Sequence, residues 1–456
     1  MLITFKVSNF LSFSEQIEFS MRAGQVRELR HHLVEGKGRN DIDILKSAVI
    51  YGANASGKSN FIKALEFFKT LLKKGLPQTS TENKYFRLDA KNANLPTQFE
   101  LEFKHNNKMY AYGVVLSLKD RTIKEEWLFE LLKTTDKPVF ERLVLENGKS
   151  EISIGIKLDS DGKKRFDVYK KDVKDSQFFL SMINDKNIEE ITNIQPFKDT
   201  FEWIQDSIVI IYPDTKTTGL DYIGDNEEMK KVYCHFLQLF NTGVKDIETV
   251  EQEIDETFPK KIQEEILNRL TEKQPKRLVI RNGNSRNTFT FFKNENNELK
   301  VLKLNTRRNL KNSNEFISFE ISDESDGTQR IMDFIPALVS LTKSDKTYLI
   351  DEIDRSLHPE LTQKLLEVFF NNTQNIESQL IVTTHESSLL DLNLLRRDEI
   401  WFVEKDLDGA SNMYSLEQFK PRHDKEVRKS YLQGRFGAIP FVSNVENLGW
   451  LQELAK

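Results

Sequence analysis

The feature that most constrains the fold is an eight-residue segment that matches the pattern G-x-x-x-x-G-K-[ST] at every fixed position. A short apolar run at 48–51 leads into it, and residues 60–74 follow with apolar side chains at spacings of three and four. An apolar strand, a glycine-rich turn and an amphipathic helix in this order are typical of a phosphate-binding loop. The segment reads Gly52, Ala53, Asn54, Ala55, Ser56, Gly57, Lys58 and Ser59.

The residue types in this loop suit the phosphates of a nucleotide. Glycines let backbone N–H groups curl around phosphate oxygens, and the N-terminus of the following helix adds a partial positive charge. We expect Lys58 to reach the β- and γ-phosphates and Ser59 to bind Mg²⁺. The alternative, a chance Gly-Lys-Ser turn, is disfavoured by the flanking strand and helix. Residues 52–59 and the adjacent Asn60 are therefore the expected nucleotide-binding residues.

A second apolar strand, expected at 347–350, ends in two adjacent carboxylates, Asp351 and Glu352. At the edge of a buried strand beside the phosphate loop, Asp351 would hold Mg²⁺ through water and Glu352 would polarise the attacking water. An acidic first turn of a helix is the alternative, because Asp and Glu are favoured there. The phosphate loop in the same chain favours the catalytic pair.

Three further segments are each weak signals when taken alone. Ser325 and Gly327 stand at the start of an expected helix, where a hydroxyl and backbone N–H groups can face an anion. Asp354 follows the carboxylate pair at once. His385 ends the apolar strand 380–384, and such a histidine can sense the γ-phosphate. The order of these segments along the chain is more informative than any one of them.

This order resembles that of the ABC-ATPase heads of SMC, Rad50, RecF and OLD-type proteins. The resemblance implies a Mg²⁺-dependent ATPase in which two heads form a homodimer and sandwich ATP between them. It implies that Ser325 and Gly327 face the phosphate loop of the second copy, that Asp354 crosses the interface, and that His385 is the switch histidine. The implied catalytic residues are Lys58, Glu352 and His385, and the implied metal ligands are Ser59 and Asp351.

The sequence departs from the pattern of those heads at several positions. In the signature motif of those heads a leucine usually precedes the serine, which is Ser325 here, but this chain has Glu324. Gln or Glu usually follows the glycine of the motif, which is Gly327 here, but this chain has Thr328. Leu11 replaces the arginine of the Asn-Phe-Arg-Ser segment that related heads often carry, so no arginine is available there for a nucleotide contact. Gln98, at the start of an expected strand, is the candidate for the Q-loop glutamine.

A closer resemblance is to compact bacterial ATPases of the AAA15/AAA21 group, which includes RloA and the AbiL-like abortive-infection ATPases. The stretches that carry it are residues 7–13, 46–60, 99–117 and 431–441. The resemblance implies a regulatory ATPase, a dimer or a higher oligomer, in bacterial anti-phage defence. Its partner would be an effector, a nuclease or toxin encoded nearby, that the ATPase gates.

The expected fold is α/β: an ABC-ATPase head with a mixed central sheet flanked by helices, an antiparallel β-subdomain and a mostly helical insertion. Alternating strands and helices in the last third predict a parallel sheet. We expect an N-lobe with the phosphate loop and β-subdomain at 1–169, the helical insertion at 170–275, and a C-lobe at 276–456. Sustained heptads are absent from the sequence, which argues against the long coiled-coil arms of SMC and Rad50.

Composition sets further bounds on the class of protein. The chain of 456 residues carries a net charge of −5, so no global bias points to nucleic acid or a membrane. Cys234 is the single cysteine, which leaves no intrachain disulfide and fits a reducing compartment. No apolar run approaches the roughly 18 residues needed to span a bilayer. We expect a cytoplasmic protein.

A local charge bias keeps a second function open, that of a DNA-repair or recombination ATPase that binds DNA directly. Residues 273–311 contain eleven Lys or Arg against Glu295 and Glu298. Basic strands of this kind can contact a phosphate backbone, form a solvated face or dock an acidic partner. The residues that carry this interpretation include Lys276, Arg277, Arg281, Arg286, Arg307 and Arg308.

Two patterns raise the question of a nuclease within the chain itself. Glu404, Asp406 and Asp408 have the residue types of a TOPRIM-like acidic set, but they lie together in an expected hairpin turn rather than on separate strands. Arg27 and His32 fit an R-x4-H ribonuclease pattern, but they lie in a glycine-rich loop. We therefore interpret the acidic set as a hairpin turn and the R-x4-H pattern as part of a loop. The protein is then expected to act as a switch rather than as a nuclease.

Overall fold

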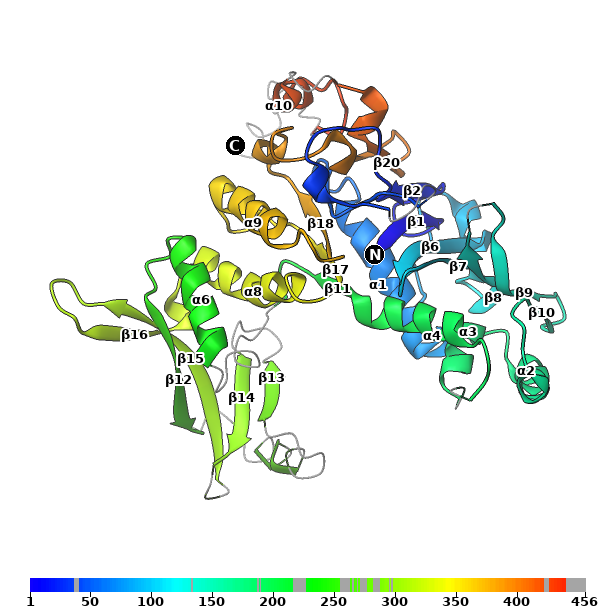
Figure 1. Ribbon diagram of the computed structural model, residues 1–456, viewed down its shortest axis with the longest axis horizontal. Coiled ribbons are helices and arrows are strands. Elements are labelled where there is room, and N and C mark those ends of the chain that lie inside the picture. The colour runs from blue at the N-terminus through cyan, green and yellow to red at the C-terminus, as the bar shows by residue number, and fades with distance from the viewer. Residues whose placement is uncertain are drawn as a thin grey trace, which may run out of the picture. The chain divides into compact units, whose positions relative to one another are not determined.

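The computed structural model describes residues 1–36, 41–132, 134–186, 188, 190–215, 227–254, 263–264, 266–268, 270, 277–281, 288–294, 296, 298–421 and 426–439. The chain forms two compact units, and Figure 1 labels their elements where there is room. Unit 1 comprises Met1–Tyr212, Ser344–Asp354 and Leu366–Lys456, and unit 2 comprises Pro213–Lys343 and Arg355–Leu365. Each unit has its own sheets and its own buried apolar cluster.

The centre of unit 1 is a six-stranded mixed sheet with the strand order β11-β17-β18-β5-β19-β20. Neighbouring strands from β11 to β19 run parallel, and β20 pairs antiparallel with β19. Every residue of β5, β17 and β18 is buried, as expected for strands covered on both faces. This sheet confirms the predicted fold class. Its strands are β11 (Ile208–Ile211), β17 (Thr347–Ile350), β18 (Gln379–Thr384), β5 (Ser47–Tyr51), β19 (Ile400–Lys405) and β20 (Ser411–Ser415).

Helix α1 (Lys58–Lys74) follows the phosphate loop and fills the core of unit 1. Its predicted apolar face is buried. The ring of Phe61 meets that of Phe5 edge-on at 5.7 Å between centroids, and Phe68 stacks on Phe99 at 5.3 Å. Because Phe5 and Phe99 belong to a second sheet, α1 packs against that sheet.

The second sheet of unit 1 has seven strands in the order β10-β9-β8-β7-β6-β1-β2, and all its pairings are antiparallel. On β6 the apolar residues Phe99, Leu101 and Phe103 are buried and the polar residues between them are half-buried. The predicted antiparallel β-subdomain is thereby confirmed. The strands are β1 (Leu2–Ser8), β2 (Ile17–Ser20), β6 (Thr97–His105), β7 (Lys108–Ser117), β8 (Thr122–Leu131), β9 (Lys137–Val144) and β10 (Ser150–Ile154).

Short helices continue unit 1 after this sheet. They are α2 (Ser160–Asp172), α3 (Phe179–Asn184), α4 (Gln195–Glu202) and a π-helix at Trp203–Ser207. Aromatic contacts join these helices to the sheet. The ring centroid of Phe140 lies 5.2 Å from those of Phe179 and Phe197, and the Trp203 ring stacks on Phe103 with 4.3 Å between centroids. Their buried rings extend the apolar core of unit 1.

Among its described residues, unit 2 contains a five-stranded antiparallel sheet and the helices α6 (Glu227–Leu239) and α8 (Asp326–Leu341). Strands β12, β15, β14 and β13 lie in that order, and β16 also pairs with β15. The strands are β12 (Asp246–Glu253), β13 (Arg277–Arg281), β14 (Thr288–Lys293), β15 (Leu299–Asn309) and β16 (Phe316–Glu320). Helices α6 and α8 contact one another. Helix α9 (Pro359–Asn372), predicted at 359–370, begins in unit 2 and ends in unit 1.

Strand β12 differs from the expectation that 170–275 is mostly helical. It pairs with β15 along eight positions, with Asp246 opposite Arg307 and Glu253 opposite Lys300. Both cross-strand pairs are ion pairs. The basic partners lie 61 and 47 residues later in the sequence, so the local pattern alone did not reveal the strand.

The part of the chain that the structure describes contains no helix that is both long and apolar enough to cross a bilayer.

Candidate functional site

The predicted phosphate loop connects β5 to α1 in a conformation that requires its glycines. Gly57 has φ 118° and Ala55 has φ 61°, so the chain passes through the left-handed region twice. A side chain at Gly52 would collide with the carbonyl oxygen of Val403 and would lie 2.6 Å from Ser56 Oγ. One at Gly57 would collide with Ser411 Oγ. The loop is therefore packed tightly between α1 and the β19–β20 hairpin.

Lys58 is held inside the loop by the backbone. Its side chain is 5% exposed, and Nζ donates to the carbonyl oxygens of Gly52 at 2.7 Å and Ala53 at 3.0 Å. Burial lowers the pKa of Lys58 to about 8, and the carboxylates of Asp351, Asp354 and Glu352 oppose that shift. The loop therefore carries a cation that loses its proton more readily than an exposed lysine does.

Asp351 lies at the C-terminal end of β17, as the sequence predicts, and its position is fixed by Thr383 on the neighbouring strand β18. The Thr383 hydroxyl donates to Asp351 Oδ1 at 2.6 Å and accepts the Glu352 N–H at 2.8 Å. Glu352 has φ 49°, so the chain turns as soon as the strand ends. Ile353 N–H donates to Thr383 O at 3.0 Å and secures that turn. Thr383 is a site residue that the sequence analysis did not single out.

His385 lies at the end of β18, next to the phosphate loop. Its Nδ1 is 3.4 Å from Lys58 Nζ, and its backbone N–H is 3.4 Å from both carboxylate oxygens of Asp354. Burial, and then the charge of Lys58, lower the pKa of His385, which favours the neutral form of its ring. A neutral ring can accept a hydrogen bond from Lys58 at Nδ1. Lys58, Asp351, Asp354 and His385 are thus gathered at the ends of three adjacent strands.

Two oxygen donors near this strand edge suit a divalent cation. Asp351 is a buried carboxylate whose Oδ1 accepts from Thr383, and Ser59 is a half-buried hydroxyl in the first turn of α1. Hard oxygen ligands of this kind fit Mg²⁺, which keeps several non-protein ligands. Among the described residues no group of three or more His, Cys, Asp or Glu is close enough to hold a metal.

Ser325 and Gly327 belong to unit 2 and begin helix α8. Ser325 is the N-cap, and its Oγ accepts the Thr328 N–H at 3.3 Å. A Cβ on Gly327 would lie 2.8 Å from the carbonyl oxygen of Ser356. The exposed Ser325 and half-buried Gly327 leave the helix N-terminus accessible in this unit.

Two departures from the ABC pattern have structural explanations. Glu324 is buried and accepts hydrogen bonds from Thr306 Oγ1 and Arg308 Nη2, both at 2.5 Å, so a carboxylate is satisfied where an apolar residue is usual. Leu11 has φ 49° in a tight turn between Phe10 and Phe13. The Q-loop candidate remains a prediction: Gln98 lies on β6 opposite Val115.

The acidic set near residue 406 forms a turn, as favoured from the sequence. Asp406 Oδ1 accepts the N–H groups of Asp408 at 3.0 Å and Ala410 at 2.8 Å, which closes the β19–β20 hairpin. Glu404 accepts the Ala438 N–H at 2.9 Å. The carboxylates of Asp406 and Glu404 therefore accept hydrogen bonds from backbone N–H groups and have a structural role.

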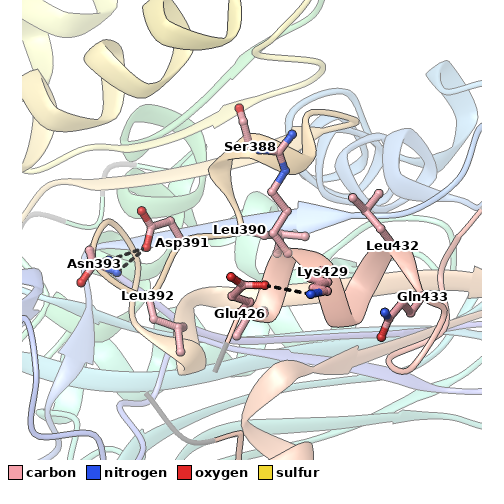
Figure 2. A pocket seen from close by; sticks show the side chains of 11 residues that line it. Ser388, Leu390, Asp391, Leu392, Asn393, Glu426, Lys429, Leu432 and Gln433 are labelled. Carbon is pink, nitrogen blue, oxygen red and sulfur yellow. Dashed lines mark hydrogen bonds and ion pairs between the residues drawn. The ribbon is translucent and has the colours of Figure 1, made fainter. Parts of the chain in front are cut away.

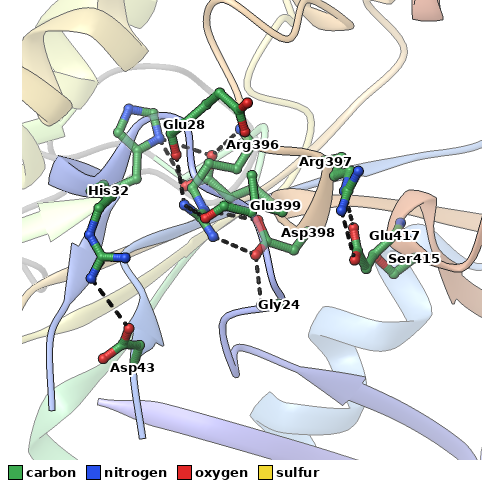
Figure 3. Close-up of polar contacts among 12 residues, drawn as sticks. Gly24, Glu28, His32, Asp43, Arg396, Arg397, Asp398, Glu399, Ser415 and Glu417 are labelled. Atoms are coloured by element: carbon green, nitrogen blue, oxygen red, sulfur yellow. Dashed lines mark hydrogen bonds and ion pairs between the residues drawn. The ribbon is translucent and has the colours of Figure 1, made fainter. Parts of the chain in front are cut away.

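His32 of the R-x4-H pattern is buried in a polar network of unit 1 (Figure 3). Its Nδ1 lies 2.9 Å from Glu399 Oε2, and its ring stacks on Phe370 at 3.6 Å between centroids. Glu399 also accepts from the hydroxyl of Ser47, the first residue of β5, at 2.7 Å. His32 therefore has a structural role near the N-terminal ends of β5 and β19, where it is buried from solvent.

The basic stretch 273–311 is only partly described. Lys276 and Arg286 lie outside the described residues, and of Arg277 and Arg281 only the backbone on β13 is described. The described basic residues of β15 are paired with carboxylates: Arg307 with Asp246 at 3.1 Å, Arg308 with Glu324 at 2.5 Å, Lys303 with Glu320 at 3.0 Å and Lys300 with Glu253. These pairs offset the positive charge of the described part of β15.

A cavity of about 660 Å³ lies beside the segment that follows His385 (Figure 2). Ser388 and residues 390–393 line one part of it, and residues of helix α10 (Val427–Leu432) line another. The stretch 431–441, which contributed to the family resemblance, begins here. Tyr431 stacks on Phe402 at 5.6 Å between centroids, and its hydroxyl donates to Ala438 O at 3.1 Å. Pro440 and Phe441 of that stretch lie outside the described residues.

Comparison with known families supports the class that the loop and strand edge define. A family model described as "AAA domain, putative AbiEii toxin, Type IV TA system" matches residues 47–202 and 292–391. The matched residues are more than half of the chain, and the protein belongs to this family. Membership confirms the predicted resemblance to compact ATPases of the SMC/Rad50-like ABC type. A search of curated proteins finds no significant match.

Among solved structures, SMC head domains resemble the chain at low similarity. The SMC head domain from Thermotoga maritima is 12% identical, with a TM-score of 0.38 over 91% of this chain and 98% of that one. An Smc head with an extended coiled coil from Pyrococcus furiosus, bound to the C-terminal domain of ScpA, is 13% identical, with a TM-score of 0.34 over 92% and 97%. Because both TM-scores lie below 0.5, family membership rests on the sequence match alone.

Proposed function

We propose that this protein is a regulatory ATPase that binds and hydrolyses Mg²⁺-ATP. The observation that carries the proposal is the convergence of Lys58, Asp351 and His385 at the ends of β5, β17 and β18, at the opening of the phosphate loop. The AAA-type family to which the chain belongs supports ATP as the nucleotide.

Each residue has a role that follows from its chemistry. Backbone N–H groups of residues 52–60 cradle the phosphates, and Lys58 donates to the β- and γ-phosphates. Ser59 and Asp351 would hold Mg²⁺, which supplies positive charge to the phosphate oxygens when bound. Glu352, next to Asp351 at the strand end, polarises the attacking water, and the second ring nitrogen of His385 donates to a γ-phosphate oxygen.

We further propose that ATP closes a homodimer, which can assemble into a higher oligomer. In this arrangement Ser325 and Gly327 of one copy complete the phosphate loop of the other, and Asp354 crosses the interface. The accessible N-terminus of α8 supports the proposal, because helix N-termini favour anions. ATP binding and hydrolysis would then gate an effector, a nuclease or toxin, in bacterial anti-phage defence in the cytoplasm. The toxin–antitoxin description of the family supports that setting.

Phosphate release by the purified protein tests the proposal. The wild-type chain is expected to hydrolyse ATP, and Lys58→Ala is expected to lose activity. Lys63→Ala is the matched control, since Lys63 is exposed on the same helix. Equal activity of the wild type and Lys58→Ala, or no activity of the wild type with Mg²⁺, contradicts the assignment.

Direct DNA binding has less support than the regulatory function. The described arginines of β15 are engaged in ion pairs, which leaves little free positive charge on that strand.

A further inference from the structure

Two buried hydroxyls, on segments that are distant in sequence, lie against the phosphate loop. Ser411, the first residue of β20, is 2% exposed, and Ser12, in the turn after β1, is 8% exposed. Ser411 Oγ lies 2.6 Å from the carbonyl oxygen of Ser56 and 2.8 Å from Ser12 Oγ. Asn60 Nδ2, in the first turn of α1, donates to Ser12 Oγ at 2.8 Å.

The order of donors and acceptors in this chain of hydrogen bonds is fixed by counting protons. The Asn60 NH₂ group can only donate, and the Ser56 carbonyl can only accept. Each hydroxyl has a single proton, so Ser411 must donate to Ser56 O and Ser12 must donate to Ser411 Oγ. The hydrogen bonds therefore run in one direction, from Asn60 through the two serines to Ser56. Both ends of this relay lie on the phosphate loop or the helix that it opens.

The relay determines where a neighbouring N–H group points. In a trans peptide the carbonyl of one residue and the N–H of the next point in opposite directions, and the described residues contain no cis peptide bond. Because Ser411 draws the Ser56 carbonyl outward, the Gly57 N–H is turned to the opposite, inner side of the loop. Phosphate oxygens are bound by N–H groups on that side.

Packing around Gly57 restricts the same peptide. A Cβ on Gly57 would collide with Ser411 Oγ and would lie 2.9 Å from Ser12 Oγ. The two hydroxyls thus occupy the space that a side chain would need. The loop cannot shift toward the β19–β20 hairpin without meeting them.

The serines are themselves held in place by the backbone. The N–H and carbonyl groups of Phe10 and Phe13 bond to each other at 2.9 Å, which closes the turn that carries Ser12. Ser411 N–H donates to Ser12 O at 2.7 Å and joins that turn to β20. Asn9 anchors the start of the turn through bonds from its amide to the carbonyls of Asn92 and Leu95, both at 2.9 Å.

We infer that Ser12 and Ser411 are positioning residues for nucleotide binding, which set the orientation of the Ser56–Gly57 peptide. The inference rests on the proposed ATP-binding function. It assigns a role to Ser12 of the N-terminal turn, where Leu11 stands in place of the arginine that related heads often carry. It also gives β20, outside the phosphate-loop motif, a part in the same site.

The test is ATP affinity and the separation of KM from kcat in Ser411→Ala and Ser12→Ala. Removing the Ser411 hydroxyl leaves a buried carbonyl without its donor, so the KM and Kd for ATP should rise about 5- to 100-fold. The kcat at saturating ATP should change less. Ser12→Ala should have a smaller effect of the same kind. Ser411→Thr, which keeps the hydroxyl, should restore part of the affinity.

Ser415→Ala is the matched control. Ser415 is buried on the same strand, but its Oγ accepts the Glu417 N–H at 3.1 Å and serves the following turn. Its ATP affinity should equal that of the wild type. If both Ser411→Ala and Ser12→Ala bind ATP with wild-type affinity, the inference is overturned. If Ser411→Ala does not fold, the ATP affinity of Ser12→Ala alone decides. Failure of the wild type to bind ATP would instead contradict the proposed function.

Discussion

The phosphate-loop region of unit 1 and the signature region of unit 2 differ in how far each is completed by its own surroundings. In unit 1, Lys58 bonds to the loop carbonyls and lies 3.4 Å from His385, and Asp351 is fixed by Thr383. In unit 2, Ser325 is exposed and its hydroxyl caps its own helix. The difference teaches that the first region is ordered by its own contacts, whereas the second leaves a helix N-terminus accessible, as the proposed dimer requires.

The largest effect should come from removing the carboxylate that would polarise water. Glu352→Gln keeps the size of the side chain but removes its basicity, so ATP hydrolysis should fall about 10²- to 10⁴-fold while ATP binding persists. Turnover and nucleotide binding measured on one preparation check this. Glu360→Gln, at an exposed position on α9, is the control and should retain wild-type turnover. Wild-type turnover in Glu352→Gln would remove Glu352 from the catalytic half-site.

The affinity for ATP should fall about tenfold per pH unit at high pH, because the buried Lys58 ammonium loses its proton. The pKa of Lys58 is lowered to about 8, so the ammonium is lost as pH rises through that value. ATP phosphates favour the charged form, so ATP affinity should fall above pH 8 and binding near pH 8 should take up a proton. Calorimetry in buffers of different ionisation enthalpy measures the proton uptake. No uptake, with flat affinity from pH 7 to 9, would show that Lys58 does not face the phosphates.

A smaller effect is expected at Thr383, which joins the two carboxylate positions. Thr383→Val removes the donor to Asp351 and the acceptor for the Glu352 N–H. The free energy of unfolding should fall by about 1–3 kcal/mol, and turnover should fall several-fold. Urea denaturation and a phosphate-release assay check the two parts. If stability falls but turnover does not, Thr383 supports the strand and not the site.

Much of the fold and half of the site were predictable because their signals are local. The phosphate loop has fixed spacing between its glycines, Lys58 and the flanking elements, and β17 carries Asp351 at its end. The hydroxyl relay was not predictable, because Ser12 and Ser411 meet only through the pairing of distant strands. Strand β12 was missed for the same reason: its acidic residues are explained by partners on β15. Local periodicity contains no information about such pairings.

The central claim, that two copies complete one another's sites, is tested most directly by mixing two inactive variants. Lys58→Ala disables the phosphate loop and keeps the signature; Ser325→Arg blocks the signature and keeps the loop. Each alone should be inactive. In an equal mixture about half of the dimers contain both variants and one intact composite site, so ATP hydrolysis should recover to roughly a quarter of the wild-type rate. A mixture as inactive as its components, or wild-type turnover by Ser325→Arg alone, would contradict the account.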